Sequence, residues 1–312
     1  MRALVTGATG FLGSHLTEHL LHARATVAVL TRPGTDPWRI APLMPRLIRI
    51  EGDLRELAAI ERDITEFAPD TVFHLGWHGV INRYRDDPAQ IDANLWSTLN
   101  LIRLSLRIGC RTWIGLGSQA EYGPLNRLAS EDDPAHPTTT YGAVKLCIRF
   151  VGERLAVDSG LRFVWLRLFS AYGPKDNPNW MIPTLIRTLL KGNRPALTAC
   201  EQKWDYLYVA DAVEAIYRVA TTPAAKGVFN LGSGQAYPLR AVVEQIRDLV
   251  NPACELGFGE IPYRFDQVMH LEADIARLRT ATGWTPRTPL AAGLRKTVSW
   301  YQQVDASICE GR

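Results

Sequence analysis

The stretch that decides the fold is RALVTGATGFLG, residues Arg2–Gly13. It begins with the apolar run Ala3–Val5, which is typical of a buried parallel strand. Gly7, Gly10 and Gly13 follow with the spacing G-x-x-G-x-x-G, and leucines at helical spacing come next. Glycines let the backbone turn tightly against a pyrophosphate, and the free N–H groups at the start of a helix bind that anion. Strand, glycine turn and helix together predict the first unit of a dinucleotide-binding fold.

Strands and helices alternate beyond this unit. Alternation of this kind predicts an α/β fold built on a doubly wound parallel sheet, the Rossmann architecture. The further strands are predicted at 26–30, 47–50, 71–75, 112–116 and 162–168. The clearest helices are predicted at 88–107, 180–191, 239–250 and 290–301.

A loop rich in Gly, Pro, Asp and Asn, at 170–179, marks the end of the alternating part. We therefore expect a cofactor-binding Rossmann domain over 1–169, to which 205–231 returns. A smaller C-terminal α+β region, mainly 170–312, is expected to bind the substrate.

The composition argues against several classes of protein. No apolar run approaches the roughly 20 residues of a membrane span, and the N-terminal stretch does not have the layout of a signal peptide. The net charge of +3 comes from scattered basic residues, which argues against a nucleic-acid partner. The five cysteines form neither a C-x-x-C pair nor a cluster with histidine, so we predict no metal site and a reducing, cytoplasmic location.

Residues at the predicted strand ends indicate how a cofactor is held. Arg32 stands where an NAD site usually carries an acidic residue, and a guanidinium there favours the 2′-phosphate of NADP(H). NAD remains possible, because Arg32 could equally be a solvated loop residue. Asp53 could accept a hydrogen bond from the adenine, or it could cap the helix that begins near Arg55. The predicted cofactor-binding residues are Gly7, Thr9, Gly10, Phe11, Leu12, Gly13, Arg32, Asp53, Leu54, Leu75, Gly76, Tyr141 and Lys145.

A candidate catalytic group follows from Tyr141 and Lys145, which have the helical spacing Y-x-x-x-K. An ammonium group beside a tyrosine lowers the tyrosine pKa and makes it a usable acid or base. Lys145 could also bind the nicotinamide ribose, and Ser118, at a strand end, could hold a substrate carbonyl oxygen. The Y-x-x-x-K spacing alone also fits an ordinary exposed pair, so the case depends on its combination with Ser118 and the glycine turn.

Taken together, the motifs resemble those of an extended short-chain dehydrogenase/reductase of the nucleotide-sugar epimerase/dehydratase family, almost from end to end. The resemblance implies a Ser/Thr–Tyr–Lys triad at Ser118, Tyr141 and Lys145, a nucleotide-sugar substrate, and a homodimer paired through the helices near 88–107 and 141–157. The motifs that carry it are Gly7–Gly13, Gly52–Leu54, His74–Gly76, Gly117–Ser118, Tyr141–Lys145, Leu166–Phe169, Tyr172–Pro174, Tyr208–Asp211 and Asn230–Gly234.

Departures from the family pattern narrow the expected reaction. The resemblance implies an Asp-Glu pair after the triad serine in 4,6-dehydratases, but Gln119 and Ala120 stand there and cannot supply carboxyl chemistry. Trp204 replaces the arginine of an Arg-Asp pair, so that either Lys203 supplies the charge or Trp204 stacks on a ring. Ser170 replaces an expected asparagine.

Several residues are candidates for contact with the substrate. Arg264 is expected on the diphosphate, although it could equally be a surface arginine, and His78 lies just past a strand end. Trp180 and Trp204 could be platforms for the ligand or parts of the core. The predicted substrate-binding residues are His78, Ser118, Gln119, Ser170, Trp180, Trp204 and Arg264.

The segments around 202–209 and 262–270 resemble the branch of 4-keto-6-deoxy-sugar reductases. We therefore expect an enzyme that reduces the C4 ketone of an NDP-4-keto-6-deoxyhexose with NADPH. Two alternatives stay open: an NAD-dependent NDP-sugar 4-epimerase, which shares the same triad, and a non-catalytic NADP(H)-binding protein.

Overall fold

The computed structural model describes residues 1–264 and 266–310. The predicted C-terminal region also contains residues 265, 311 and 312, which lie outside the described residues. Among the helices of the described part, none combines the length and the apolar character of a membrane span.

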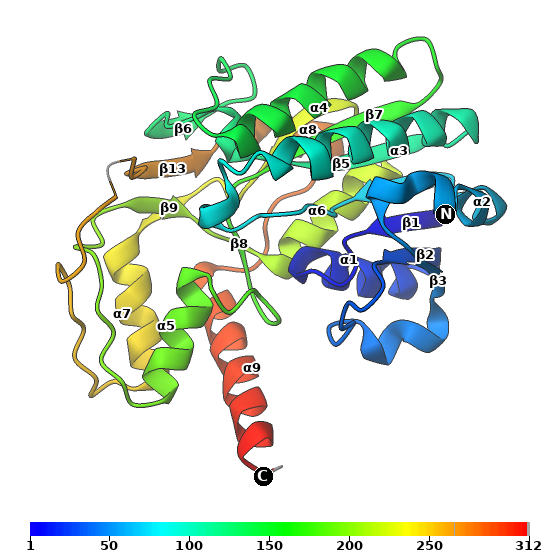
Figure 1. The fold of residues 1–312 in the computed structure, drawn as a ribbon. Coiled ribbons are helices and arrows are strands. Elements are labelled where there is room, and N and C mark those ends of the chain that lie inside the picture. The colour runs from blue at the N-terminus through cyan, green and yellow to red at the C-terminus, as the bar shows by residue number, and fades with distance from the viewer. Residues whose placement is uncertain (265, 311–312) are drawn as a thin grey trace.

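A seven-stranded sheet forms the centre of the molecule, in the order β11-β7-β5-β4-β1-β2-β3, and all its pairs are parallel (Figure 1). The chain runs outward from β1 to β3 and then continues from β4 on the other side of β1. This reversal between β1 and β4 is the switch point at which open α/β sheets bind ligands. The strands are β1 (Arg2–Thr6), β2 (Thr26–Thr31), β3 (Ile48–Glu51), β4 (Thr71–His74), β5 (Thr112–Ser118), β7 (Arg162–Leu168) and β11 (Gly227–Leu231).

Helices cover both faces of this sheet, because its buried strands send apolar side chains in both directions. Leu4 packs into the core under α2, α3 and α4, whereas its neighbour Val5 packs into the core under α1 and α6. The prediction of a doubly wound parallel sheet is therefore confirmed. The helices named here are α1 (Phe11–His22), α2 (Leu57–Phe67), α3 (Trp96–Arg107), α4 (Thr140–Ala156) and α6 (Val209–Thr221).

A smaller part of the molecule lies beyond the carboxyl ends of the central strands. A four-stranded sheet in the order β12-β9-β13-β6 and a short pair, β8 with β10, are accompanied by α5, α7 and α9, which pack together (Figure 1). Its strands are β6 (Arg127–Ala129), β8 (Ala171–Tyr172), β9 (Lys203–Asp205), β10 (Leu207–Tyr208), β12 (Ala236–Pro238) and β13 (His270–Ala273). The remaining helices are α5 (Met181–Leu190), α7 (Leu239–Val250), α8 (Ala276–Thr282) and α9 (Leu290–Glu310).

The structure corrects several sequence-based boundaries. No strand was predicted between 124 and 140, but β6 lies there and pairs with β13 from the last part of the chain. The helix expected at 290–301 continues to Glu310. The long helix expected at 88–107 contains a turn of π-helix at Ile91–Leu95, and this turn matters for the site. The helix predicted at 239–250 matches α7.

Candidate active site

The glycine turn has the geometry that a bound pyrophosphate requires. Gly7 has a φ of +75°, and a Cβ on it would lie 2.6 Å from the backbone nitrogen of Gly76. A Cβ on Gly13 would overlap the carbonyl oxygen of Gly7, so α1 packs directly on the turn. Within the described residues no side chain caps α1 at Gly10, so its first N–H groups remain available for an anion.

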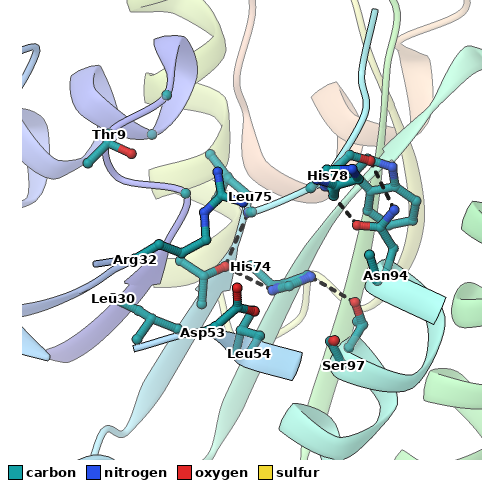
Figure 2. Close-up of a pocket in the computed structure, with 18 of the residues that line it drawn as sticks. Thr9, Leu30, Arg32, Asp53, Leu54, His74, Leu75, His78, Asn94 and Ser97 are labelled. Atoms are coloured by element: carbon teal, nitrogen blue, oxygen red, sulfur yellow. Dashed lines mark hydrogen bonds between the residues drawn. The ribbon is translucent and has the colours of Figure 1, made fainter. Parts of the chain in front are cut away.

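A cavity of about 350 Å³ opens beside this turn (Figure 2). It runs from the glycine turn past the carboxyl ends of β2, β3 and β4, which suits an extended dinucleotide. The predicted cofactor-binding residues that line it are Gly7, Thr9, Gly10, Phe11, Leu12, Gly13, Arg32, Asp53, Leu54, Leu75 and Gly76. The cradle of close-packed glycines and the lining of the cavity therefore fit a nicotinamide dinucleotide.

Arg32 and Asp53 lie at the end of the cavity beyond β2 and β3. The Asp53 side chain caps the short 3-10 turn Leu54–Glu56 by accepting from the Arg55 N–H at 2.9 Å, and it also lines the cavity. A hydrogen bond from the Arg55 side chain lowers the pKa of Asp53, with smaller help from the charge of Arg32. Arg55 was not predicted, yet it lines the same cavity as Arg32 and adds a second guanidinium there.

The two histidines at and just after the end of β4 have different roles. His74 lies buried between the hydroxyls of Thr6, 2.9 Å from Nδ1, and Thr98, 3.0 Å from Nε2. Burial lowers the pKa of His74 to about 3, so the ring is neutral and has a structural role. His78 is exposed at the mouth of the cavity, where its backbone N–H donates to Asn94 Oδ1 at 2.7 Å (Figure 2).

Asn94 lies in the turn of π-helix and lines the same cavity. Its side chain also donates to the His78 carbonyl oxygen at 3.0 Å and is only 4% exposed. Asn94 is therefore a buried residue that ties the segment after β4 to the helix. The turn of π-helix at Ile91–Leu95 accompanies this inward placement, and the spacing of apolar residues alone does not reveal such a turn.

The structure brings the predicted triad together. Ser118 ends β5 and Tyr141 lies in the first turn of α4, where the serine is close enough to act on the pKa of the phenol. Lys145 lies one turn further along α4, with Nζ 5.7 Å from the centroid of the Tyr141 ring. The Lys145 ammonium donates to the carbonyl oxygen of Leu116 at 2.6 Å. A carbonyl-polarising serine, a phenol and a cation thus meet beside the cavity.

The electrostatics of Tyr141 differ from the expectation. Burial raises the pKa of Tyr141, although the nearby Ser118 side chain and the charge of Arg85 act in the opposite direction. Burial also lowers the pKa of Lys145 to about 7, so at neutral pH its charge is only partial. The predicted lowering of the tyrosine pKa is therefore wrong for this structure, because desolvation outweighs the neighbouring charges. Tyr141 is held as a protonated phenol, the form of a proton donor.

Trp77 was not predicted as a site residue, yet its ring contacts two members of the triad, Lys145 and Tyr141. The ring lies over Lys145, with Nζ 3.4 Å from its centroid, and meets the Tyr141 ring edge-on at 5.6 Å. Its indole N–H donates to Gln90 Oε1 at 2.8 Å, which fixes the ring. The π-face of Trp77 stabilises the charged form of Lys145, which burial disfavours. The position of Trp77, three residues after the end of β4, was the available signal.

Glu121 is a second site residue that was not predicted, and its carboxylate holds the backbone N–H of Ser118. The carboxylate is completely buried and accepts hydrogen bonds from the Ser118 N–H at 2.9 Å, the Trp165 indole at 2.8 Å and the Arg167 guanidinium at 2.8 Å. With the Ser118 side chain it forms a capping box around the short turn 119–121. The serine-to-glutamate spacing of three was a signal that could have found it.

The other residues that were predicted to bind the substrate lie in different parts of the structure. Gln119 is half-buried beside the triad, and Arg264 is half exposed near Asp266, with 3.5 Å between the charged atoms. Ser170 follows β7, where its carbonyl oxygen accepts from the Leu207 N–H, and Trp180 precedes α5.

Trp204 lies in β9 beside the exposed Lys203. The tryptophan packs on a small apolar cluster made of Tyr122, Ala129, Phe169, Leu271 and Ala273. This packing gives Trp204 a place in the core of the smaller sheet.

Comparisons with known proteins agree on the family and differ on the reaction. The model of the NAD dependent epimerase/dehydratase family matches residues 3–232. The GDP-6-deoxy-D-mannose reductase of Pseudomonas aeruginosa is 27% identical, over 97% of this chain and 98% of that protein. A dTDP-glucose 4,6-dehydratase from Streptomyces griseus is 28% identical, over 96% of this chain and 94% of that protein. A crystal structure of Thermus thermophilus UDP-glucose 4-epimerase in complex with NAD is 28% identical, with a TM-score of 0.87 over 97% of this chain and 99% of that one. The chain is about equally similar to a reductase, a dehydratase and an epimerase, so its reaction has to be inferred from the residues of the site.

Proposed function

Because the chain belongs to the NAD dependent epimerase/dehydratase family and is an enzyme of the extended short-chain dehydrogenase/reductase type, we propose that it reduces the C4 ketone of an NDP-4-keto-6-deoxyhexose with NADPH. One observation carries this choice. Tyr141 is a buried phenol whose raised pKa keeps it protonated beside Ser118, and the positions after Ser118, Gln119 and Ala120, offer no carboxyl group. The site is thus equipped to donate a proton to a carbonyl oxygen and lacks the acid–base pair that elimination of water needs.

In the proposed reaction the bound nicotinamide supplies the hydride for C4. Ser118 donates a hydrogen bond to the C4 oxygen, and Tyr141 gives that oxygen its proton as negative charge develops there. Lys145, held between Leu116 and the Trp77 ring, stabilises the resulting phenolate and binds the nicotinamide ribose. One hydride and one proton convert the ketone to an alcohol, and the phenolate regains its proton from solvent.

The relatives support a nicotinamide dinucleotide as cofactor, and Arg32 with Arg55 at the far end of the cavity supports the phosphorylated form. We expect Arg32→Ala to raise the KM for NADPH by about tenfold or more while the KM for NADH changes little, since the loss of one charge-assisted hydrogen bond costs about 1.5–3 kcal/mol. Steady-state kinetics with both cofactors measures this. Equal changes for the two cofactors would contradict the assignment. Arg24→Ala, at an exposed arginine before β2, is the matched control.

A second candidate function is an NAD-dependent NDP-sugar 4-epimerase. The overall similarity to Thermus thermophilus UDP-glucose 4-epimerase, which binds NAD, favours it. An epimerase starts by oxidising C4, so its tyrosine must first accept a proton. The raised pKa of Tyr141 suits the opposite direction better.

The experiment that tests the proposal incubates the purified protein with NADPH and a panel of NDP-4-keto-6-deoxy sugars, following the absorbance of reduced nicotinamide. Oxidation of NADPH with one member of the panel supports the reductase and identifies the nucleotide. If instead an NDP-sugar is interconverted with its C4 epimer without net use of cofactor, the epimerase replaces it.

We also propose that two copies of the chain pair through α3 and α4, which pack side by side (Figure 1). Trp96 on α3 is 54% exposed and Phe150 on α4 is 55% exposed, so these two helices present large apolar side chains that a second copy would cover. The double variant Trp96→Arg/Phe150→Arg is expected to sediment at the 34.8 kDa of the single chain, and the wild type at about twice that mass. Leu128→Arg, at an exposed leucine in β6, is the control. A monomeric wild type would exclude the dimer.

A further inference from the structure

The Lys145 ammonium lies among three aromatic rings, and Trp77 supplies the nearest of them. The Lys145 Nζ is 3.4 Å from the centroid of the Trp77 ring, 5.7 Å from that of Tyr141 and 5.9 Å from that of Trp165. The face of an aromatic ring carries negative charge density, so it attracts a cation within about 6 Å. Of these three rings, that of Trp77 also lines the cavity that fits the cofactor. Trp77 therefore stands in contact with both the cavity and the cation of the triad.

Gln90 fixes the Trp77 ring through an amide group whose hydrogen-bonding capacity is fully used. Its Oε1 accepts from the Trp77 indole N–H at 2.8 Å and from Asn94 Nδ2 at 3.0 Å. Its Nε2 donates to the carbonyl oxygens of Gly79 and Tyr84, both at 2.8 Å. A glutamine amide has two donors and two acceptor positions, so all four are occupied, and the residue is only 1% exposed. The indole is thereby held in one orientation.

The charged and titratable groups around Lys145 cannot replace this contact. The buried carboxylate of Glu121 attracts the ammonium, but it is already paired with the Arg167 guanidinium at 2.8 Å. His74 is neutral, and Tyr141 is uncharged as a phenol. Among the described residues no carboxylate forms an ion pair with Lys145, whose ammonium donates its hydrogen bond to a backbone carbonyl oxygen. A buried cation with so few partners depends on the aromatic face beside it.

We infer that Trp77, fixed by Gln90, is a positioning residue of the reaction that keeps Lys145 charged and in place as the pH rises. Burial alone favours the neutral amine, and the indole face favours the ammonium. The neutral amine could not stabilise a Tyr141 phenolate, so the loss of this proton would end efficient turnover. Trp77 thus extends the working range of the enzyme to higher pH. The inference rests on the proposed function only in giving the charged lysine a part in turnover.

The test titrates Lys145 directly, by NMR of the full chain labelled with ¹³C at the lysine ε-carbons. The chain has six lysines, and Lys145 is the buried one, so its signal should titrate at lower pH than the other five and disappear in Lys145→Arg. The other five, none of them buried, are Lys175, Lys191, Lys203, Lys226 and Lys296.

The variants separate the aromatic face from simple cover. Trp77→Leu keeps an apolar side chain over the lysine but removes the π-face, whereas Trp77→Phe keeps a smaller one. Gln90→Met leaves the indole and removes its acceptor. Trp38→Leu is the matched control, because Trp38 is 44% exposed and stacks on Trp300, outside the lining of the cavity.

In Trp77→Leu the midpoint of the Lys145 titration is expected to fall by about 0.5–1.5 pH units, because the ammonium loses an attraction of the size of one cation–π contact. Trp77→Phe and Gln90→Met should each give part of this fall, and Trp38→Leu none. A midpoint in Trp77→Leu that equals that of Trp38→Leu would overturn the inference. A rise would overturn it as well, since the ring would then act on Lys145 mainly by excluding water.

Turnover gives a second measurement. We expect the decline of kcat for NADPH oxidation at high pH to begin at lower pH in Trp77→Leu, by the same shift, while kcat on the acid side of the decline approaches that of the wild type. An equal loss at every pH would assign Trp77 a structural role only and contradict the inference. The NMR titration needs no turnover, so it decides whether Trp77 keeps Lys145 charged even if no sugar of the panel is reduced.

Discussion

Replacing Tyr141 with phenylalanine is expected to lower turnover at least ~10²-fold, on the scale of a lost general acid. The substitution removes only the phenolic oxygen, so the edge-on contact of the ring with Trp77 and the packing of Lys145 stay in place. Ser118 would still polarise the carbonyl, but the alkoxide would have no placed proton donor. Initial rates of NADPH oxidation at saturating substrate measure the effect on kcat, since binding should change little.

The interpretation of Tyr141→Phe depends on two comparisons. Tyr217→Phe, on α6 where the ring packs against His19, should retain wild-type turnover, and the fluorescence of bound NADPH should be the same in both variants. Ser118→Ala should lose less than Tyr141→Phe, because polarisation is only part of the electrostatic stabilisation. Near-full activity of Tyr141→Phe would remove the phenol from the mechanism and leave another group to donate the proton.

The parts of this site that could be predicted are those that depend on local sequence. The glycine turn must be glycine for steric reasons, and the carboxyl ends of parallel strands meet at one edge of a sheet, so Asp53 and Gly76 fall on the same cavity as Gly7. The helical spacing of Tyr141 and Lys145 and the position of Ser118 at a strand end predicted their meeting for the same reason.

The parts that could not be predicted depend on contacts between distant segments. The pKa of Tyr141 is set by how deeply the assembled molecule buries it, and residue types alone suggested the wrong direction. Arg85 lies in a loop, and no periodic pattern in the sequence predicts that its carbonyl oxygen accepts from the Tyr141 N–H. The pairing of β6 with β13 joins the first and the last strand of the smaller sheet in sequence order, and no feature of Arg127–Ala129 predicts it. Such facts come from tertiary packing, which overrides local preference.

The largest effect on stability is expected from Glu121→Gln. This change removes the charge opposite Arg167, whose side chain is only 4% exposed and lies 2.8 Å from the carboxylate. Breaking a buried ion pair by removing one partner costs about 3–5 kcal/mol, because the other charge stays buried without compensation. Urea unfolding followed by tryptophan fluorescence measures the free energy of unfolding. Glu66→Gln is the matched control, since its pair with Arg62 has a similar separation of 2.7 Å but is mostly exposed, and the loss there should stay below ~1 kcal/mol.

A double variant separates the charge from the hydrogen bonds. Glu121→Leu/Arg167→Met removes both charges, so we expect it to be more stable than Glu121→Gln. Recovery should be incomplete, because the Trp165 indole and the Ser118 N–H both lose their acceptor. A double variant no more stable than Glu121→Gln would mean that these two hydrogen bonds, rather than the ion pair, hold Glu121 in place. In either case the Ser118 N–H loses the Glu121 carboxylate that holds it. Turnover of the folded double variant should therefore fall even if its stability is recovered.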